Sequence, residues 1–172
     1  SINIISPINQ LGYGVAGLNI VSSLDKSFEV SLWPLGQPEC DNSYIPTIKR
    51  CIARSELPDF NAPCLRIWHQ HDMSQFVGNG IKVGFPIFEL DDFTENEKHH
   101  LNFPDKIFVC SEWAKDVITQ STGRDDVEIH VVPLGVDRSI FRPVEPNTGE
   151  TYTFFNCGKW EVRKGHDIIV EA

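Results

Sequence analysis

A positively charged loop near the end of the chain has the composition of an anion-binding site. Lys159, Arg163 and Lys164 lie between Gly158 and Gly165, after an aromatic, apolar run and before a helix-like sequence. A loop between a strand and a helix offers free backbone N–H groups and the positive end of the helix dipole. The pattern therefore favours a phosphate or diphosphate ligand. The alternative is a solvated loop with three surface cations.

A second group of polar side chains follows a strand-like apolar run over residues 64–68. This run leads directly into His69-Gln70-His71-Asp72. Ligands bind at the carboxyl ends of strands in open parallel sheets, and imidazole can donate or accept a proton at neutral pH. We therefore expect a sugar-binding or catalytic histidine here. The alternatives are a structural pair that caps the next turn, or a metal site, for which no third ligand is evident.

The segment Gly12-Tyr13-Gly14-Val15-Ala16-Gly17 satisfies the G-x-G-x-x-G pattern of dinucleotide-binding proteins. In that pattern the first glycine follows the strand almost at once, but here residues 6–11 intervene. The second expected strand also lacks an acidic residue at its tip to hold a ribose. Both observations argue against a nicotinamide or flavin cofactor. We expect a glycine loop that lets another ligand or domain approach the backbone closely.

Composition excludes several classes of protein. The 172 residues are 41% hydrophobic and 23% charged, which is typical of a globular chain. A net charge of −9 argues against nucleic acid as the main partner. No apolar run approaches the roughly 20 residues of a membrane span. Five widely spaced cysteines match no disulfide framework and no metal-binding pair, so we expect a reducing, cytoplasmic setting.

Strand-like and helix-like segments alternate along most of the chain. This alternation predicts an α/β fold, a Rossmann-like parallel sheet with helices on both faces. Thr94 and Ser111 are the expected helix caps, and Pro86 suggests an edge strand or a bulge. The expected strands are 2–5, 28–33, 64–68, 82–88, 106–110 and 128–132. The expected helices follow the glycine segment and cover 45–54, 74–77, 94–101 and 112–120, with a short turn of helix at 139–141.

The Pro-, Asn- and Gly-rich residues 144–150 are the best candidate for a domain boundary. We expect a first domain over 1–143, a linker over 144–150, and the first strand and helix start of a truncated second domain over 151–172. A lone strand and helix stub has no sheet of its own. It is expected to be mobile, or to pair with the first domain or with another copy of the chain.

Taken together, these features resemble the GT-B glycosyltransferases, specifically the retaining, nucleotide-sugar-dependent group called glycosyltransferase family 4. The segment 132–143 is similar to the family's interdomain pattern V-x-x-G-V-D-x-x-x-F-x-P, and 158–165 resembles its donor-phosphate loop. These two blocks are specific in their order and spacing. Two weaker blocks are 7–24, similar to the family's glycine loop and first helix, and the histidine segment 69–72.

The resemblance implies two Rossmann-like domains, with the acceptor bound mainly by the first and the nucleotide sugar by the second. It implies that Gly14, Lys159 and Lys164 contact the donor diphosphate and that His71, the catalytic candidate, lies near the transferred sugar. Lys159 stands where many members have Arg, so a bidentate phosphate contact is not expected. No metal is required if the lysines stabilise the leaving diphosphate. The residues assigned to the acceptor or sugar side are Gly12, Tyr13, His69 and Asp72.

The implied activity is transfer of a sugar, with retention, from a nucleotide-diphosphate sugar to a glycan, lipid or small-molecule acceptor, without a further cofactor. The family's paired-glutamate motif lies further along than Ala172, so we expect this chain alone to be inactive. Self-association through the 151–172 stub is a further expectation. The alternatives are a sugar-nucleotide epimerase or phosphorylase of the same architecture, a non-catalytic sugar- or nucleotide-binding domain, and, third, an oxidoreductase.

Overall fold

The computed structural model describes residues 1–123, 127–145, 149 and 152–171. Contacts between Cα atoms divide the chain into two units, Ser1–Gly135 and Val136–Ala172. This division falls ahead of the 144–150 linker, so the predicted domain limits stay a prediction.

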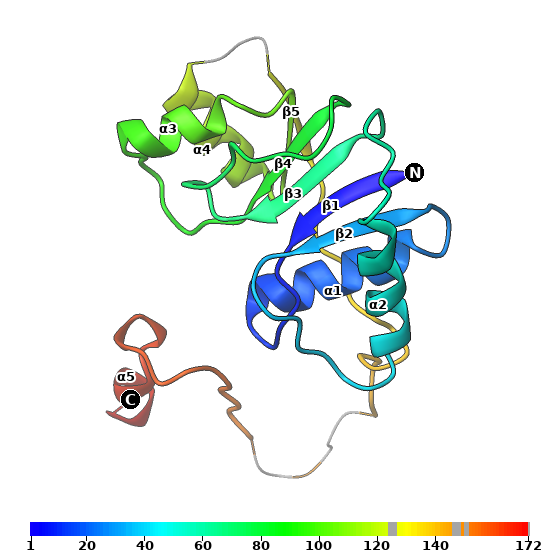
Figure 1. Ribbon diagram of the computed structural model, residues 1–172. Helices are drawn as coiled ribbons and strands as arrows, with labels where there is room; N and C mark the ends of the chain where they lie inside the picture. Colours follow the sequence, from blue (N-terminus) through cyan, green and yellow to red (C-terminus); the bar gives the residue numbers. More distant parts are fainter. Residues whose placement is uncertain (124–126, 146–148, 150–151, 172) are drawn as a thin grey trace. The chain divides into compact units, whose positions relative to one another are not determined.

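The first unit is built on one six-stranded sheet in which every neighbouring pair of strands is parallel (Figure 1). The strand order β2-β1-β3-β4-β5-β6 reverses direction at β1, as in Rossmann-like folds. The predicted fold class is confirmed. The strands are β1 (Ile2–Ser6), β2 (Val30–Pro34), β3 (Cys64–Trp68), β4 (Lys82–Pro86), β5 (Lys106–Val109) and β6 (Glu128–Val131).

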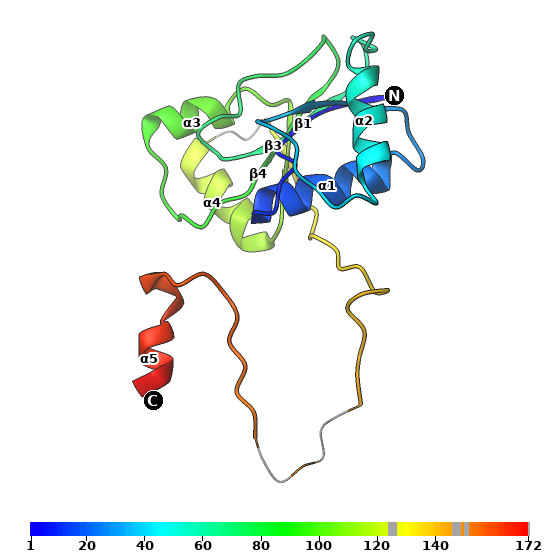
Figure 2. The ribbon, with the colours of Figure 1, turned by 60° about the horizontal axis from the view of Figure 1, so that its bottom comes forward.

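Helices cover both faces of this sheet. Because side chains alternate along a strand and the registers are known, Leu65 and Phe85 share one face, while Ile107 and Val109 lie on the other. The first face packs on α1 (Gly12–Leu24) and α2 (Ile45–Arg54), and the second packs on α3 (Glu95–Leu101) and α4 (Glu112–Thr122). Figures 1 and 2 show these two helix pairs beside opposite halves of the sheet. The result is two separate apolar clusters, one on each face of the sheet.

Helix starts follow the expected local chemistry. Thr94 forms the capping box of α3, since its side chain accepts from the Glu97 N–H while the Glu97 carboxylate accepts from the Thr94 N–H. Ser111 Oγ accepts from the Ala114 N–H at 3.2 Å and starts α4. Both caps were predicted from the sequence and are confirmed.

A glycine loop was expected at residues 12–17, but in the structure this segment forms the first turns of α1. Gly14 and Gly17 are buried because the helix lies against the chain that leads into it. A Cβ on Gly14 would lie 2.3 Å from the Asn9 nitrogen, and one on Gly17 would lie 2.5 Å from the Pro7 oxygen. These glycines therefore allow close packing of a helix on a neighbouring backbone.

The helix expected over 74–77 is absent, since neighbouring side chains hydrogen-bond its backbone groups. Arg66 Nη1 donates to the Gln75 carbonyl at 3.3 Å, and the Val77 N–H donates to the Cys64 sulfur at 3.3 Å. Both partners come from β3. Tertiary contacts thus hold this segment in an extended path that local sequence does not reveal.

Pro86 does not mark an edge strand, because β4 lies between β3 and β5 in the sheet. It is the last residue of β4, and β5 pairs only with Val83 and Gly84. The missing N–H of Pro86 therefore falls beyond the hydrogen bonds that hold β4 to β5.

The second unit has little regular structure. Residues 152–157 form no strand, because no neighbouring strand among the described residues pairs with them. A single turn of 3₁₀-helix, η1 (Val162–Lys164), precedes α5 (His166–Glu171), which lies in the helix-like sequence that follows Gly165. The helical turn expected at 139–141 is an ordinary turn in which the Phe141 N–H bonds the Asp137 carbonyl.

Candidate functional site

The carboxyl ends of the parallel strands bring together polar groups that are far apart in the sequence. His69 directly follows β3, Ile87 directly follows β4, and Tyr13 lies in the first turn of α1. The Tyr13 hydroxyl lies 2.9 Å from His69 Nδ1 and 2.5 Å from the Ile87 carbonyl oxygen. Of the predicted sugar-side residues, the structure thus places Tyr13 and His69 in direct contact.

His71 joins this cluster through its ring. The imidazoles of His69 and His71 stack with their centroids 5.0 Å apart and their planes within 17° of each other. Tyr13 lies against the other rings, 4.3 Å from His69 and 5.5 Å from Trp68. His71 is exposed whereas His69 is half-buried, so the pair presents an inner and an outer imidazole at the sheet edge.

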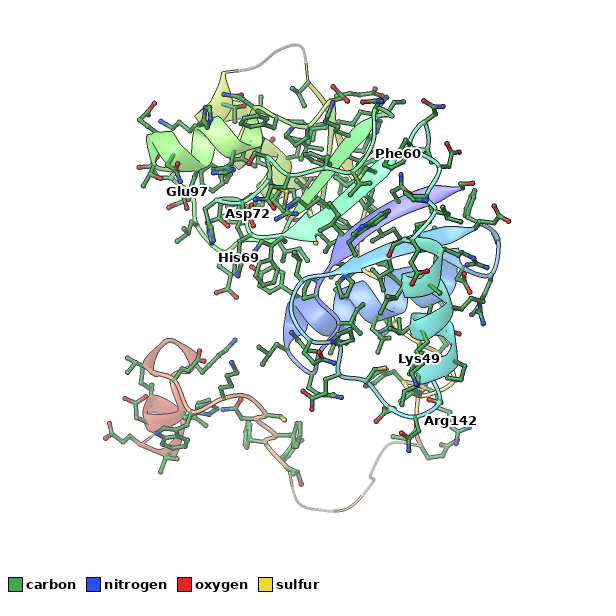
Figure 3. All side chains as sticks on the ribbon, viewed as in Figure 1. Lys49, Phe60, His69, Asp72, Glu97 and Arg142 are labelled. Atoms are coloured by element: carbon green, nitrogen blue, oxygen red, sulfur yellow. The ribbon has the colours of Figure 1, made fainter. Side chains whose placement is uncertain are left out.

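Gln70, between the two histidines, points the opposite way. It is only 6% exposed, and its Nε2 donates to Glu97 Oε1 at 2.8 Å. Glu97 also caps α3, so one carboxylate both starts the helix and anchors the histidine turn. With Gln70 held inward, His69 and His71 are left to face outward together. Figure 3 shows His69, Asp72 and Glu97 near the carboxyl end of β3.

Asp72, a predicted sugar-side residue, is bound to Arg66. The Arg66 side chain is 1% exposed, and its Nη2 donates to Asp72 Oδ2 at 2.6 Å while its Nε donates to the Asp72 carbonyl at 2.7 Å. The same guanidinium reaches Gln75. Arg66 therefore fixes the turn that carries the histidines. Sequence reasoning missed it, although a charged residue inside the apolar run 64–68 was a visible signal.

The electrostatics of the cluster keep His69 neutral and Glu97 ionised at neutral pH. Burial, and then the neighbouring His71, lower the pKa of the His69 imidazole. Burial, and then Glu89, raise the pKa of the Tyr13 phenol. The Thr94 backbone N–H, followed by the Gln70 side chain, lowers the pKa of Glu97, and His71 contributes in the same direction.

The glycines predicted to approach a ligand differ in their surroundings. Gly12 is exposed and a Cβ there would meet nothing within 4 Å, whereas the same position on Gly14 is filled by Asn9. α1 also begins without a side-chain cap and without an acidic residue in its first turn. Its first N–H groups thus keep the polarity that suits an anion. A contact between Gly14 and a diphosphate stays a prediction.

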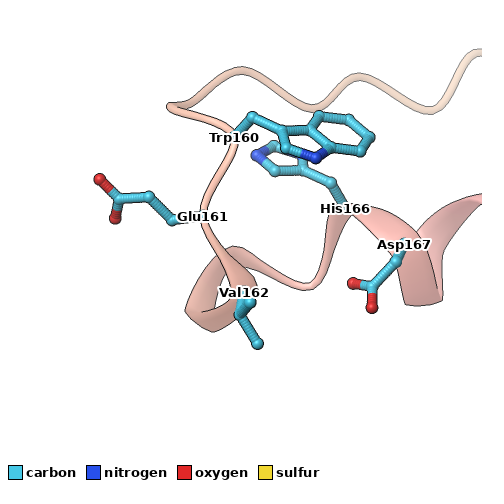
Figure 4. A pocket seen from close by; sticks show the side chains of 5 residues that line it. All are labelled: Trp160, Glu161, Val162, His166 and Asp167. Carbon is cyan, nitrogen blue, oxygen red and sulfur yellow. The ribbon is translucent and has the colours of Figure 1, made fainter.

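The cationic loop lies in the second unit, where a histidine organises it. His166 Nε2 lies 2.8 Å from the Lys159 carbonyl oxygen, and its Nδ1 lies 2.7 Å from Asn156 Nδ2. Figure 4 shows the indole of Trp160 stacked on this imidazole, with the ring centroids 5.0 Å apart. Lys159 and Lys164 are both exposed. Sequence reasoning did not find the role of His166, which depends on contacts across the loop.

Three further features concern the described part of the chain: metal-binding groups, membrane-spanning helices and disulfides. No group of three or more His, Cys, Asp or Glu side chains there could hold a metal ion. Among the same residues, no helix combines the length and the apolar character needed to cross a membrane. All five cysteines are free thiols.

Comparison with known proteins adds no relative. No protein-family model matches the chain, and neither the curated proteins nor the solved structures contain a significant match. The functional argument therefore rests on the residues and their geometry.

Proposed function

We propose that this chain belongs to a retaining GT-B glycosyltransferase that uses a nucleotide-diphosphate sugar, with the first unit on the acceptor side. The observation that carries the proposal is the cluster of Tyr13, His69 and His71, in which the first turn of α1 meets the segment that follows the carboxyl end of β3. Open parallel sheets bind their ligands at this edge, near the point where the strand order reverses. The four sequence blocks described above support the same assignment.

In this proposal the two histidines and the cations divide the work. His71, as the exposed imidazole, contacts the transferred sugar, and His69 with Tyr13 orients a hydroxyl group of the sugar or acceptor. Lys159 and Lys164 stabilise the negative charge that develops on the leaving nucleoside diphosphate. If the lysines do this, the reaction needs no metal ion. The uncapped start of α1 at Gly12–Gly14 offers backbone N–H groups that suit an anionic group of a ligand. Asp72 does not contact the sugar in this proposal; its ion pair with Arg66 fixes the turn that carries the histidines.

The proposal includes the setting and partners of the protein. Five free cysteines are compatible with a reducing cytoplasm. A net charge of −9 favours a small anionic ligand held by a local cation cluster over nucleic acid. Self-association through the 152–171 region would bury large apolar side chains there that are almost fully exposed in the single chain, namely Tyr152, Phe154 and Phe155.

The test is a calorimetric and thermal-shift titration of the chain with UDP, GDP and ADP. We expect weak binding that is selective for one base and lost in the double variant Lys159→Ala, Lys164→Ala. The matched control is Lys26→Ala, Lys49→Ala, which removes two exposed lysines from the first unit. Equal binding by both double variants, or no binding of any nucleotide by the unaltered chain, would remove the donor-loop assignment.

A further inference from the structure

We propose that Tyr13 holds His69 as its Nδ1–H tautomer, so that Nε2 offers a lone pair to a neutral hydroxyl group of a sugar or polyol. This inference rests on the proposed function for the identity of the ligand. The tautomer itself is a property of the free chain and does not depend on any donor nucleotide.

The tautomer follows from the two short contacts of one hydroxyl group. A carbonyl oxygen can only accept, so the 2.5 Å contact between the Tyr13 hydroxyl and the Ile87 oxygen uses the single phenolic proton. The same oxygen lies 2.9 Å from His69 Nδ1. That second contact needs a proton as well, and only Nδ1 can supply it. Tyr13 is thus a donor to the Ile87 carbonyl oxygen and an acceptor from the histidine.

The remaining nitrogen of His69 is then an acceptor. Since burial and the stacked His71 disfavour the imidazolium, the ring carries one proton at neutral pH. That proton is on Nδ1, so Nε2 keeps its lone pair. Within the described part of the chain, no hydrogen bond is made to His69 Nε2. The half-buried ring therefore presents an unused acceptor beside an exposed imidazole.

An unused acceptor selects the chemistry of its ligand. A hydroxyl group can donate to the lone pair, whereas an ionised phosphate oxygen carries no proton and can only accept. Glu97 also interacts electrostatically with the neighbouring His71, and its ionised carboxylate disfavours an anion beside that outer imidazole. The inner histidine is therefore a specificity-determining residue for a neutral hydroxyl, separate from the cationic loop predicted to hold the diphosphate.

Nuclear magnetic resonance of ¹⁵N-histidine-labelled protein tests the tautomer directly. Long-range ¹H–¹⁵N correlations should show a protonated Nδ1 and an unprotonated Nε2 for His69. His166 is the internal control because its contacts require the opposite tautomer, in which Nε2 donates to Lys159 and Nδ1 accepts from Asn156. Protonation of Nε2 of His69 in the unaltered chain would overturn the proposal.

The variant Tyr13→Phe keeps the ring but removes the hydroxyl, so His69 should shift toward the Nε2–H tautomer that free histidine prefers. Tyr44→Phe, which alters a tyrosine outside this cluster, should leave His69 unchanged. A Tyr13→Phe spectrum identical to that of the unaltered chain would show that Tyr13 does not select the tautomer.

The ligand class is tested by titrating the same sample with methyl glucoside, methyl mannoside and myo-inositol, and separately with inorganic diphosphate. We expect at least one polyol to move the His69 Nε2 resonance, with affinity about tenfold weaker in Tyr13→Phe. A response to diphosphate alone, or to none of the polyols, would overturn the hydroxyl assignment. Nucleotide binding at Lys159 and Lys164 is measured in a separate titration. A failure of the donor-loop proposal can therefore be told apart from a failure of the hydroxyl assignment at His69.

Discussion

Alanine at Gly14 should destabilise the first unit, whereas alanine at Gly12 should not. Both glycines lie in the first turn of α1, so the two variants gain similar intrinsic helix propensity, at most about 1 kcal/mol. They differ in what the new methyl group meets. At Gly12 it meets nothing within 4 Å, and at Gly14 it meets the backbone of Asn9. The pair therefore isolates the effect of packing from that of helix propensity.

The size of the effect follows from the distances. The methyl carbon added in Gly14→Ala would lie 2.3 Å from the backbone nitrogen of Asn9 and 2.5 Å from its backbone oxygen, whereas ordinary van der Waals contact begins at 3.4 Å. Backbone must therefore move by about 1 Å, which for overpacked sites costs about 1–3 kcal/mol. A full propensity gain of about 1 kcal/mol would leave a net loss of about 0–2 kcal/mol for Gly14→Ala, and Gly14→Ala should be about 1–3 kcal/mol less stable than Gly12→Ala because both variants share that gain. Gly12→Ala should be neutral or slightly stabilising.

Urea unfolding followed by circular dichroism and tryptophan fluorescence measures both variants under one set of conditions. The unfolding midpoint should fall in Gly14→Ala and stay in place, or rise, in Gly12→Ala, with unchanged slopes. Equal midpoints for the two variants would refute the conclusion that Gly14 is required for close packing on the 6–9 segment. The glycine pattern would then need another explanation, such as contact with a ligand.

Two other perturbations address the residues beneath the histidines. Arg66→Met should lower the free energy of unfolding by about 3 kcal/mol, since it removes buried charged hydrogen bonds to Asp72 and Gln75. The control Arg50→Met, at a half-exposed position, should lower the free energy of unfolding much less. Equal losses in urea unfolding would contradict the anchoring role of Arg66. Glu97 has a pKa below its ordinary 4.5 when folded, so the unfolded chain binds more protons, and stability should fall as pH drops below 4.5 through the folded pKa. Glu97→Gln should flatten that part of the stability–pH curve, and parallel curves for the two proteins would show that the carboxylate is not stabilised by folding.

Local sequence was sufficient for the class of fold and for most of its elements. The helix at 45–54 and the strand at 64–68 have the limits expected from their apolar spacing and flanking residues. The capping box of Thr94 and Glu97 was equally visible, because both partners lie within one turn. Short-range rules succeed at these positions since the groups that decide the structure are neighbours in the chain.

Sequence also located the histidine segment at a strand end, but it could not assign the work of each side chain there. Asp72 is a partner of the buried Arg66, and Gln70 is an inward anchor that leaves the histidines outward. Both pairings depend on which face of β3 each residue occupies and on where α3 packs. A helix expected over 74–77 failed for the same reason, since Arg66 and Cys64 hydrogen-bond its backbone groups.

The contact between Tyr13 and His69 shows the division most clearly. Sequence named His69 as a candidate because it follows the carboxyl end of a predicted parallel strand, and the resemblance to glycosyltransferase family 4 added Tyr13. Only the folded chain brings them, 56 positions apart, within 2.9 Å and adds the Ile87 carbonyl that decides the direction of the proton. Hydrogen-bond direction depends on every partner of an atom at once, and here a hydroxyl group from α1 meets partners that follow two different strands, β3 and β4. Residue types therefore follow from sequence, whereas the protonation state of the site is decided by tertiary structure.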